Sequence, residues 1–206
     1  MYASRRVLSF MDASLAQSGA GSYATAIKVA ATLFVAALTA AASQISVPLP
    51  FTPVPFTFQP MIVLLGGAVL GPRLGMAAQV AYLAAGLTGL PVFAFSPELP
   101  QGAARFLGPT GGYLMAYPFA AFVAGSLATR GFDRRYLTSV LAMAAGLAVI
   151  FIGGVTWLTL FAPGADARSL NAALATGFYP FVIADAIKLC LAATVMPMAW
   201  RFLHGD

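Results

Sequence analysis

Long stretches without a charged residue dominate this sequence. Charge is absent within residues 29–72, 74–97, 106–129 and 136–165, and a further apolar stretch, residues 172–200, contains only two charged side chains. Each stretch is long enough to cross the roughly 30 Å of hydrocarbon in a lipid bilayer, and the first is long enough for two crossings. The pattern therefore predicts transmembrane helices.

A proline-rich segment divides the first stretch. Pro48, Pro50, Pro53 and Pro55 cannot continue a helix, so this segment is predicted to be an extended, turn-rich loop. Six transmembrane helices result, and we place them near residues 24–45, 57–71, 74–93, 110–129, 136–161 and 174–202. The second has a short apolar run, which leaves open a tilted helix, a helix partly surrounded by protein, or one extended into the proline loop.

Composition supports the same class of protein. The chain of 206 residues is 60% hydrophobic and 8% charged, with a mean hydropathy of +0.87, whereas soluble domains carry about 25% charged residues. We therefore predict an all-α integral membrane protein. No internal repeat of the kind found in two-fold secondary transporters is visible. Residues 1–22 are predicted to form a mobile cytoplasmic tail, and residues 23–206 a single six-helix transmembrane domain.

Basic residues predict the orientation of these helices. With the N-terminus inside, the outer face receives only Arg105 and Arg168, whereas the cytoplasmic face receives the other basic residues of the tails and loops: Arg5, Arg6, Lys28, Arg73, Arg130, Arg134, Arg135 and Arg201. Because basic residues favour the cytoplasmic side, both termini are predicted to lie inside. The net charge of +5 then reflects topology and gives no reason to expect nucleic-acid binding.

The two charges of the last apolar stretch, Asp185 and Lys188, lie three residues apart and so share one face of a helix. A charged side chain at membrane depth costs roughly 2.5 to 3.5 kcal/mol on insertion scales, so the pair needs an explanation. One explanation is an ion pair in which each charge offsets the burial of the other. The other is a ligand site, in which an acceptor and an ammonium donor bind a polar, anionic molecule inside an apolar cavity.

The predicted outer loops are rich in proline, glycine and aromatic residues. They either pack over the bundle as a plug or form a lid over a small-molecule pocket, with Phe51, Phe93 and Phe95 as apolar walls. The two are compatible, because a lid packs when it closes. Further candidate ligand contacts at this depth are polar: Gln59, Gln101, Tyr82 and Tyr113. Structural explanations stay open, with Gln59 as a helix-start residue, Tyr82 as core and Tyr113 as an interfacial aromatic.

The sequence lacks the residue motifs that several kinds of enzyme need. The segment Gly108-Pro109-Thr110-Gly111-Gly112 has neither the spacing nor the lysine of a phosphate-binding loop, so the chain is not expected to hydrolyse ATP. His204 is the single histidine and lies near the C-terminus, which argues against a metalloprotease or a serine protease. We predict no enzyme activity, no catalytic residue, and no metal or cofactor.

Four ordered blocks of the sequence closely resemble one family, BioY. The blocks are residues 43–55 (SQISVPLPFTPVP), 64–73 (LLGGAVLGPR), 86–93 (GLTGLPVF) and 107–113 (LGPTGGY), and they are followed by Asp185-x-x-Lys188. BioY proteins are biotin-binding S-components of energy-coupling-factor (ECF) vitamin transporters. The resemblance implies a six-helix S-component bundle in the bacterial inner (cytoplasmic) membrane that binds biotin with high affinity.

The resemblance also implies partners and roles. Family members work with a transmembrane coupling protein (T-component) and ABC-type ATPase subunits, and they dock on the coupling protein through a stripe of small residues. The first helix offers three pairs at four-residue spacing, Ala26 and Ala30, Thr32 and Ala36, and Ala36 and Ala40, for which packing inside the bundle is the alternative explanation. Asp185 and Lys188 correspond to the family's acid and lysine near the start of the sixth helix. Asp185 can accept hydrogen bonds from the ureido N–H groups of biotin, and Lys188 can donate to the ureido carbonyl or to the carboxylate. The alternatives are an S-component for another small vitamin, and a membrane binding or scaffold protein whose Asp185–Lys188 pair is structural.

Overall fold

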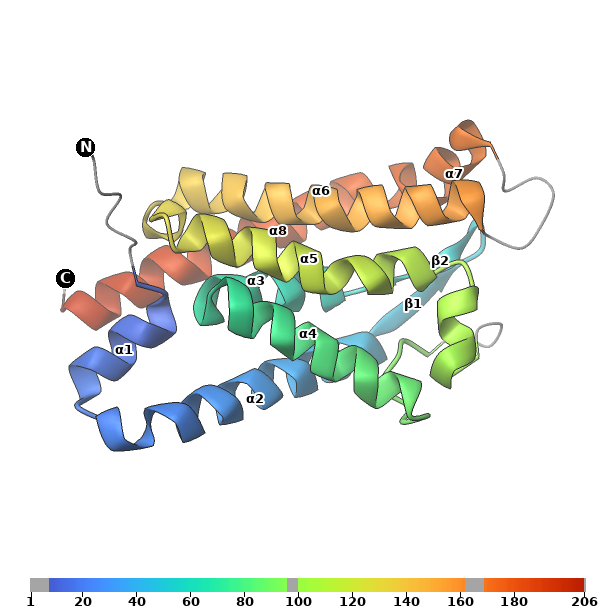
Figure 1. Ribbon diagram of the computed structural model, residues 1–206. Coiled ribbons are helices and arrows are strands. Elements are labelled where there is room, and N and C mark those ends of the chain that lie inside the picture. Colours follow the sequence, from blue (N-terminus) through green and yellow to red (C-terminus); the bar gives the residue numbers. More distant parts are fainter. Residues whose placement is uncertain (1–7, 96–99, 162–168, 206) are drawn as a thin grey trace, which may run out of the picture.

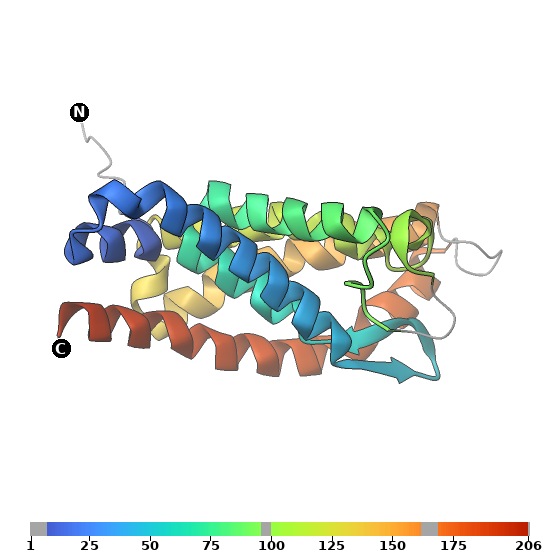
Figure 2. The same cartoon turned by 90° about the horizontal axis from the view of Figure 1, so that it is seen from below.

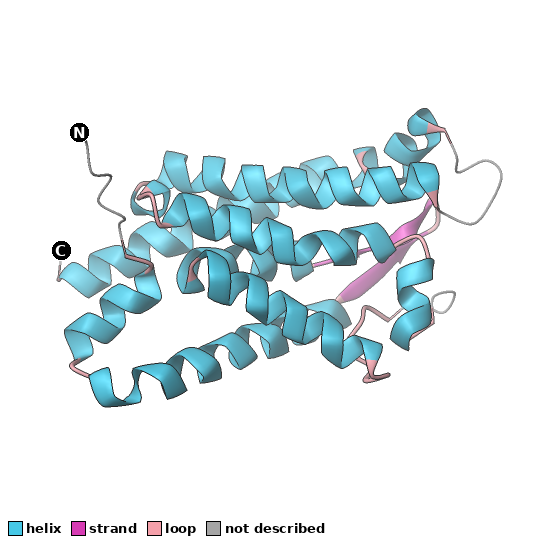
Figure 3. Cartoon of the chain, in the orientation of Figure 1, coloured by secondary structure: helices cyan, strands magenta, loops and turns pink. Residues whose placement is uncertain are grey.

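The computed structural model describes residues 8–95, 100–161 and 169–205 as one bundle of helices with a small hairpin (Figures 1 and 3). The predicted cytoplasmic residues Arg5 and Arg6 and the predicted outer residue Arg168 lie outside these ranges. Helix α1 (Phe10–Ser18) and the last turns of α8 (Tyr179–His204) lie at one end of the bundle, and the hairpin lies at the opposite end (Figures 1 and 2).

Four helices of the described chain are long and apolar enough to cross a membrane. The four are α2 (Ala24–Gln44, preceded by a 3-10 turn, Gly21–Tyr23), α5 (Gly111–Ala128), α6 (Tyr136–Leu160) and α8 (Tyr179–His204). Helix α5 is central, because it packs against α3, α4 and α6 and 67% of its apolar window is buried, compared with 17% for α2. The bounds of α2, α5 and α6 agree with the predicted ranges to within one residue, whereas α8 begins five residues after the predicted start at residue 174.

Two further helices are shorter than a full span. Helix α3 (Gln59–Leu70) has 12 residues and α4 (Pro72–Leu87) has 16 residues, so α3 is only about 18 Å long at 1.5 Å per residue. They meet at Gly71, whose φ of 82° is a conformation that favours glycine. A Cβ atom on Gly67 would lie 2.3 Å from the carbonyl oxygen of Ala121, so glycine is what lets α3 approach the α5 backbone closely.

The proline-rich segment forms a β-hairpin, which the all-α prediction did not include. Strands β1 (Ser46–Leu49) and β2 (Thr52–Thr57) pair antiparallel, with Ser46 opposite Thr57 and a shift in register between Val47 and Leu49. The shift falls at Pro48, which has no N–H to donate to the ladder. Extended backbone is what the prolines predict, but the pairing between the two strands was not foreseen.

The last predicted helix, residues 174–202, is broken near its start. Helix α7 (Leu170–Gly177) ends before α8 begins at Tyr179. The break lies where Gly177 meets α5: a Cβ atom on Gly177 would be 2.3 Å from the hydroxyl oxygen of Tyr113, and that hydroxyl donates to the Gly177 carbonyl at 2.6 Å. Pro180 occupies the first turn of α8, where a proline is tolerated.

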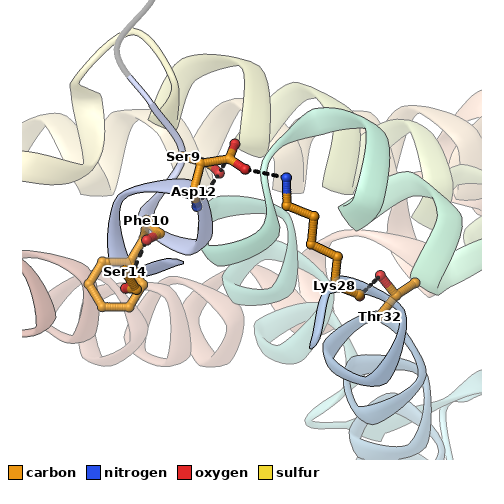
Figure 4. Close-up of polar contacts among 6 residues, drawn as sticks. All are labelled: Ser9, Phe10, Asp12, Ser14, Lys28 and Thr32. Carbon is orange, nitrogen blue, oxygen red and sulfur yellow. Dashed lines mark hydrogen bonds and ion pairs between the residues drawn. The ribbon is translucent and has the colours of Figure 1, made fainter. Parts of the chain in front are cut away.

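The N-terminal segment, predicted to be a mobile tail over residues 1–22, contains a short helix. Helix α1 (Phe10–Ser18) begins after Ser9, whose side chain caps the backbone N–H of Asp12, and the Asp12 carboxylate pairs with Lys28 of α2 at 2.6 Å (Figure 4). The Phe10 ring meets the edge of Trp200 of α8 with 5.0 Å between centroids. Helix α1 is thus capped and in contact with both α2 and α8, and its Phe10 and Ala13 side chains are partly buried against the core.

Trp200 is also held from the loop between α5 and α6. Its indole N–H donates to the Asp133 carboxylate at 2.6 Å, and the Arg134 guanidinium lies 3.2 Å from the centre of its ring. Asp133 is 2% exposed and Trp200 is 4% exposed. This end of the bundle is therefore closed by a buried polar contact as well as by apolar packing.

Candidate functional site

The Asp185–Lys188 pair lies on α8 near the end of the bundle that carries the hairpin. The two side chains form an ion pair one helical turn apart, and each residue is 7% exposed. The Lys188 ammonium also donates to the carbonyl of Thr57 at 2.7 Å and lies 3.8 Å from the centre of the Phe56 ring. The pair therefore ties α8 to the end of β2, and two of the three ammonium donors are used within the protein.

The same pair lines a cavity that contains further polar groups. Gln59 comes from the first residue of α3, Thr110 precedes α5, and Arg105 comes from the 3-10 helix η2 (Gly102–Leu107). Arg105 is 1% exposed and donates to the carbonyls of Ala94 and Pro100. Burial lowers the pKa of Arg105 from its usual value, yet an arginine side chain stays protonated in proteins. The cavity thus contains one carboxylate and two cations.

Aromatic side chains form a large part of the cavity wall. Phe93, Tyr113, Tyr117, Phe151 and Phe181 line the cavity, and Phe93 is fully buried. The Phe93 ring packs edge-on against Tyr82 and Phe106, with 5.6 Å between centroids in both cases. A wall of this kind excludes water, which strengthens the few polar bonds that a ligand would form inside it.

The structure brings most of the predicted site residues to this cavity but not all of them. Asp185, Lys188, Gln59, Tyr113 and Phe93 line it. Three other predicted residues do not line the cavity. Tyr82 lies behind the wall and accepts a hydrogen bond from the Gln59 amide at 2.6 Å, and Gln101 donates to the Phe93 carbonyl at 3.3 Å. Phe51 lies at the hairpin turn and is 61% exposed. Phe95, also predicted as a wall, is 67% exposed.

Sequence reasoning missed several residues of the cavity. It assigned Arg105 to the outer face as a loop charge, although a single cation among apolar loop residues is also what a buried anion-binding group looks like. Tyr117 follows Tyr113 by four residues, so the two share a face of α5, and this spacing could have identified it. Phe151 and Phe181 carried no signal, because apolar residues surround both in the sequence.

A bundle of apolar helices that encloses a cavity with buried charges of both signs is the architecture of a multi-pass membrane protein that binds a small polar molecule. Within that class, the chain belongs to the BioY family, whose family model matches residues 13–205.

Individual relatives agree with this assignment. The chain is 43% identical over 174 residues to the "probable biotin transporter BioY" of Pyrococcus horikoshii, covering 84% of this chain and 93% of that protein. It is 38% identical to the "biotin transporter BioY" of Thermotoga maritima, covering 77% of this chain and 87% of that protein. The structure is similar to the crystal structure of the S-component for biotin from an ECF-type ABC transporter, with a TM-score of 0.75 and 26% identity over 86% of this chain and 92% of that one.

Proposed function

We propose that this chain is the biotin-binding S-component of an ECF-type ABC transporter. The observation that carries the proposal is the grouping of Asp185, Lys188 and Arg105 in one buried cavity with aromatic walls. This set of groups complements biotin, which offers two ureido N–H donors, a ureido carbonyl, an apolar sulfur ring and a carboxylate. The names of the relatives and of the solved S-component support the same ligand.

The spacing of the charges suggests which end of biotin meets which group. The N–H and C=O groups of a ureido ring are neighbours, so the partners that bind them must also be neighbours. Asp185 and Lys188 are in contact, and the lysine has a third donor left. We assign the ureido ring to this pair. Arg105 comes from η2, away from α8, and its guanidinium suits the carboxylate.

The proposal includes a topology and partners. We propose six membrane crossings with both termini in the cytoplasm of a bacterial cell, with α3 and α4 crossing as shorter helices packed against α5. Exposed basic residues at the end of the bundle that carries the termini support this orientation: Arg73, Arg130, Arg135 and Arg201. ATP hydrolysis then belongs to separate ATPase subunits, reached through a transmembrane coupling protein. Biotin enters from the opposite, outer end.

A binding titration of the purified protein tests the function. Biotin should bind in the nanomolar range, which corresponds to a binding free energy of roughly −12 kcal/mol. The polar groups of the cavity are already fixed in place, so their side chains lose little conformational entropy when the ligand binds. Thiamine and riboflavin serve as comparison ligands. Binding of one of them together with no detectable heat from biotin would assign the cavity to another vitamin. No binding of any vitamin would favour the scaffold alternative.

A further inference from the structure

The segment between α4 and η2 is held by side chains along its backbone. Its carbonyl oxygens from residue 91 to residue 95 each accept at least one side-chain hydrogen bond. On one side the donors are Ser43, Gln44 and Ser46, at the end of α2 and the start of β1. On the other side the donors are Gln101 and Arg105. We call Ser43, Gln44 and Ser46 the α2 clasp.

The bonds of the α2 clasp differ in quality. Ser43 donates to the Val92 carbonyl at 2.6 Å, although its single hydroxyl hydrogen is shared with the Ala40 carbonyl, also at 2.6 Å. Ser46 donates to the Phe95 carbonyl at 2.9 Å. The Gln44 side-chain amide donates to the Ser43 hydroxyl oxygen at 2.7 Å, and it lies 3.4 Å from the carbonyl oxygens of residues 91 and 93. Gln44 therefore supports the segment weakly and the serine strongly.

The clasp has a physical reason and a structural consequence. An irregular segment cannot satisfy its own carbonyls, and an unsatisfied buried carbonyl is costly, so donors from neighbouring elements are needed where the segment is buried, at Phe93 and Ala94. The segment carries Phe93 and Ala94, which line the ligand cavity. Phe93 also fills the space left by Gly86, where a Cβ atom would lie 2.0 Å from its ring. Hydrogen bonds from the clasp to the backbone of this segment therefore fix the position of the Phe93 side of the cavity.

We propose that the α2 clasp positions the Phe93 wall of the ligand cavity and so sets how long a ligand stays bound. None of the three clasp residues lines the cavity, whereas Arg105 on the other side of the segment does. The clasp therefore acts on the ligand only through the wall. This inference rests on the proposed function for the identity of the ligand, and on hydrogen bonds within the protein for the positioning itself.

The test uses residues whose loss should not unfold the protein. Ser43 is fully buried, so Ser43→Ala risks a general loss of stability. Gln44 is exposed and Ser46 is half-buried, which makes the double variant Gln44→Ala/Ser46→Ala the better choice. Ser46→Thr keeps the hydroxyl and serves as the rescue. Thr88→Ala is the matched control, because Thr88 is exposed near the same segment and donates only within its own helical turn, to Ala85 at 2.8 Å.

Two measurements follow, with thermal unfolding in detergent as a check on folding. Release of radiolabelled biotin from the double variant should be about tenfold faster, a size in the range expected for the loss of the Ser46 bond together with the weaker Gln44 bonds. Hydrogen–deuterium exchange of residues 88–95 without ligand should also be faster. Ser46→Thr combined with wild-type Gln44 should restore both rates, and Thr88→Ala should change neither. A release rate equal to that of Thr88→Ala would overturn the inference.

The two measurements also separate this inference from the proposed function. If the wild-type protein does not bind biotin, the proposed function fails, while the exchange experiment still decides whether the clasp holds the segment. Faster exchange in the double variant would then support the positioning of the wall without a known ligand. Unchanged exchange would overturn the inference whatever the ligand.

Discussion

Replacing Asp185 by asparagine is the sharpest test of the site, because it changes charge and hydrogen bonding with little change in shape. In the folded protein Lys188 keeps its bond to the Thr57 carbonyl and its contact with the Phe56 ring. Removing one partner of a buried ion pair typically costs about 3 to 5 kcal/mol of stability. We expect a cost near the lower end, because the cation–π contact of about 0.5 to 2 kcal/mol remains.

The expected effect on biotin is separate from this effect on folding. Asparagine keeps an acceptor oxygen but replaces one carboxylate oxygen by a donor, so the charge-assisted bond to a ureido N–H group is lost. Such a bond is worth about 1.5 to 3 kcal/mol, which weakens binding by roughly ten- to a hundredfold. Titration calorimetry in detergent measures the affinity, and thermal unfolding measures stability. Asp12→Asn is the control, because it breaks the ion pair between Asp12 on α1 and Lys28 on α2, outside the cavity.

The double variant Asp185→Leu/Lys188→Met distinguishes a ligand site from a structural pair. Replacing both charges by apolar groups of similar size leaves no buried charge alone, so the protein should fold. If the pair binds biotin, this variant should be folded and unable to bind. A double variant with wild-type affinity would refute the site assignment, and would leave the pair as the connection between α8 and β2.

Three further predictions concern other parts of the chain. Arg105→Lys should weaken free biotin at least tenfold but leave a biotin amide almost unaffected, since only the free acid offers a carboxylate; equal losses for both ligands would argue against that contact. With Cys190 replaced by alanine, Arg135→Cys should resist an impermeant thiol reagent in intact cells and react in inverted vesicles, and labelling in intact cells would contradict the six-crossing topology. Burial alone would raise the pKa of Asp12, but Lys28 and Ser9 outweigh it and hold this pKa below 3.8. The stability difference between wild type and Asp12→Asn should be present above pH 3.8 and disappear as the pH falls through the lowered pKa. The difference is expected to be small because the carboxylate is 39% exposed.

The fold could be predicted from sequence where a single physical factor decides the structure. Charge-free stretches identified α2, α5 and α6, because charge is costly over the length that crosses the bilayer. Pro48 and its neighbours correctly excluded a helix, but whether two extended segments pair depends on contacts that a sequence does not display. The break between α7 and α8 was missed for a similar reason. The hydrogen bond from the Tyr113 hydroxyl to the Gly177 carbonyl lies at this break, and it comes from another helix.

The candidate site was predictable in proportion to how unusual each residue is in its surroundings. Asp185 and Lys188 are charges in an apolar stretch, so they could be found without a structure. Arg105 is equally unusual, but it was counted only as one of the two basic residues on the outer face. The aromatic wall could not be predicted in full, because Phe151 and Phe181 are distinguished only by the direction in which they point.

Helix α1 affects how this protein should be handled in the laboratory. Residues before the first long helix invite removal in expression work, and an N-terminal purification tag is a common choice. A truncated chain that begins at Gly21 would lack Phe10, which packs on Trp200, and Asp12, which pairs with Lys28. The indole ring that bonds to Asp133 would then lie open to detergent at the end of α8. Chains with and without α1 are therefore expected to differ in stability. Measurements of stability or of partner binding should use a chain that retains α1.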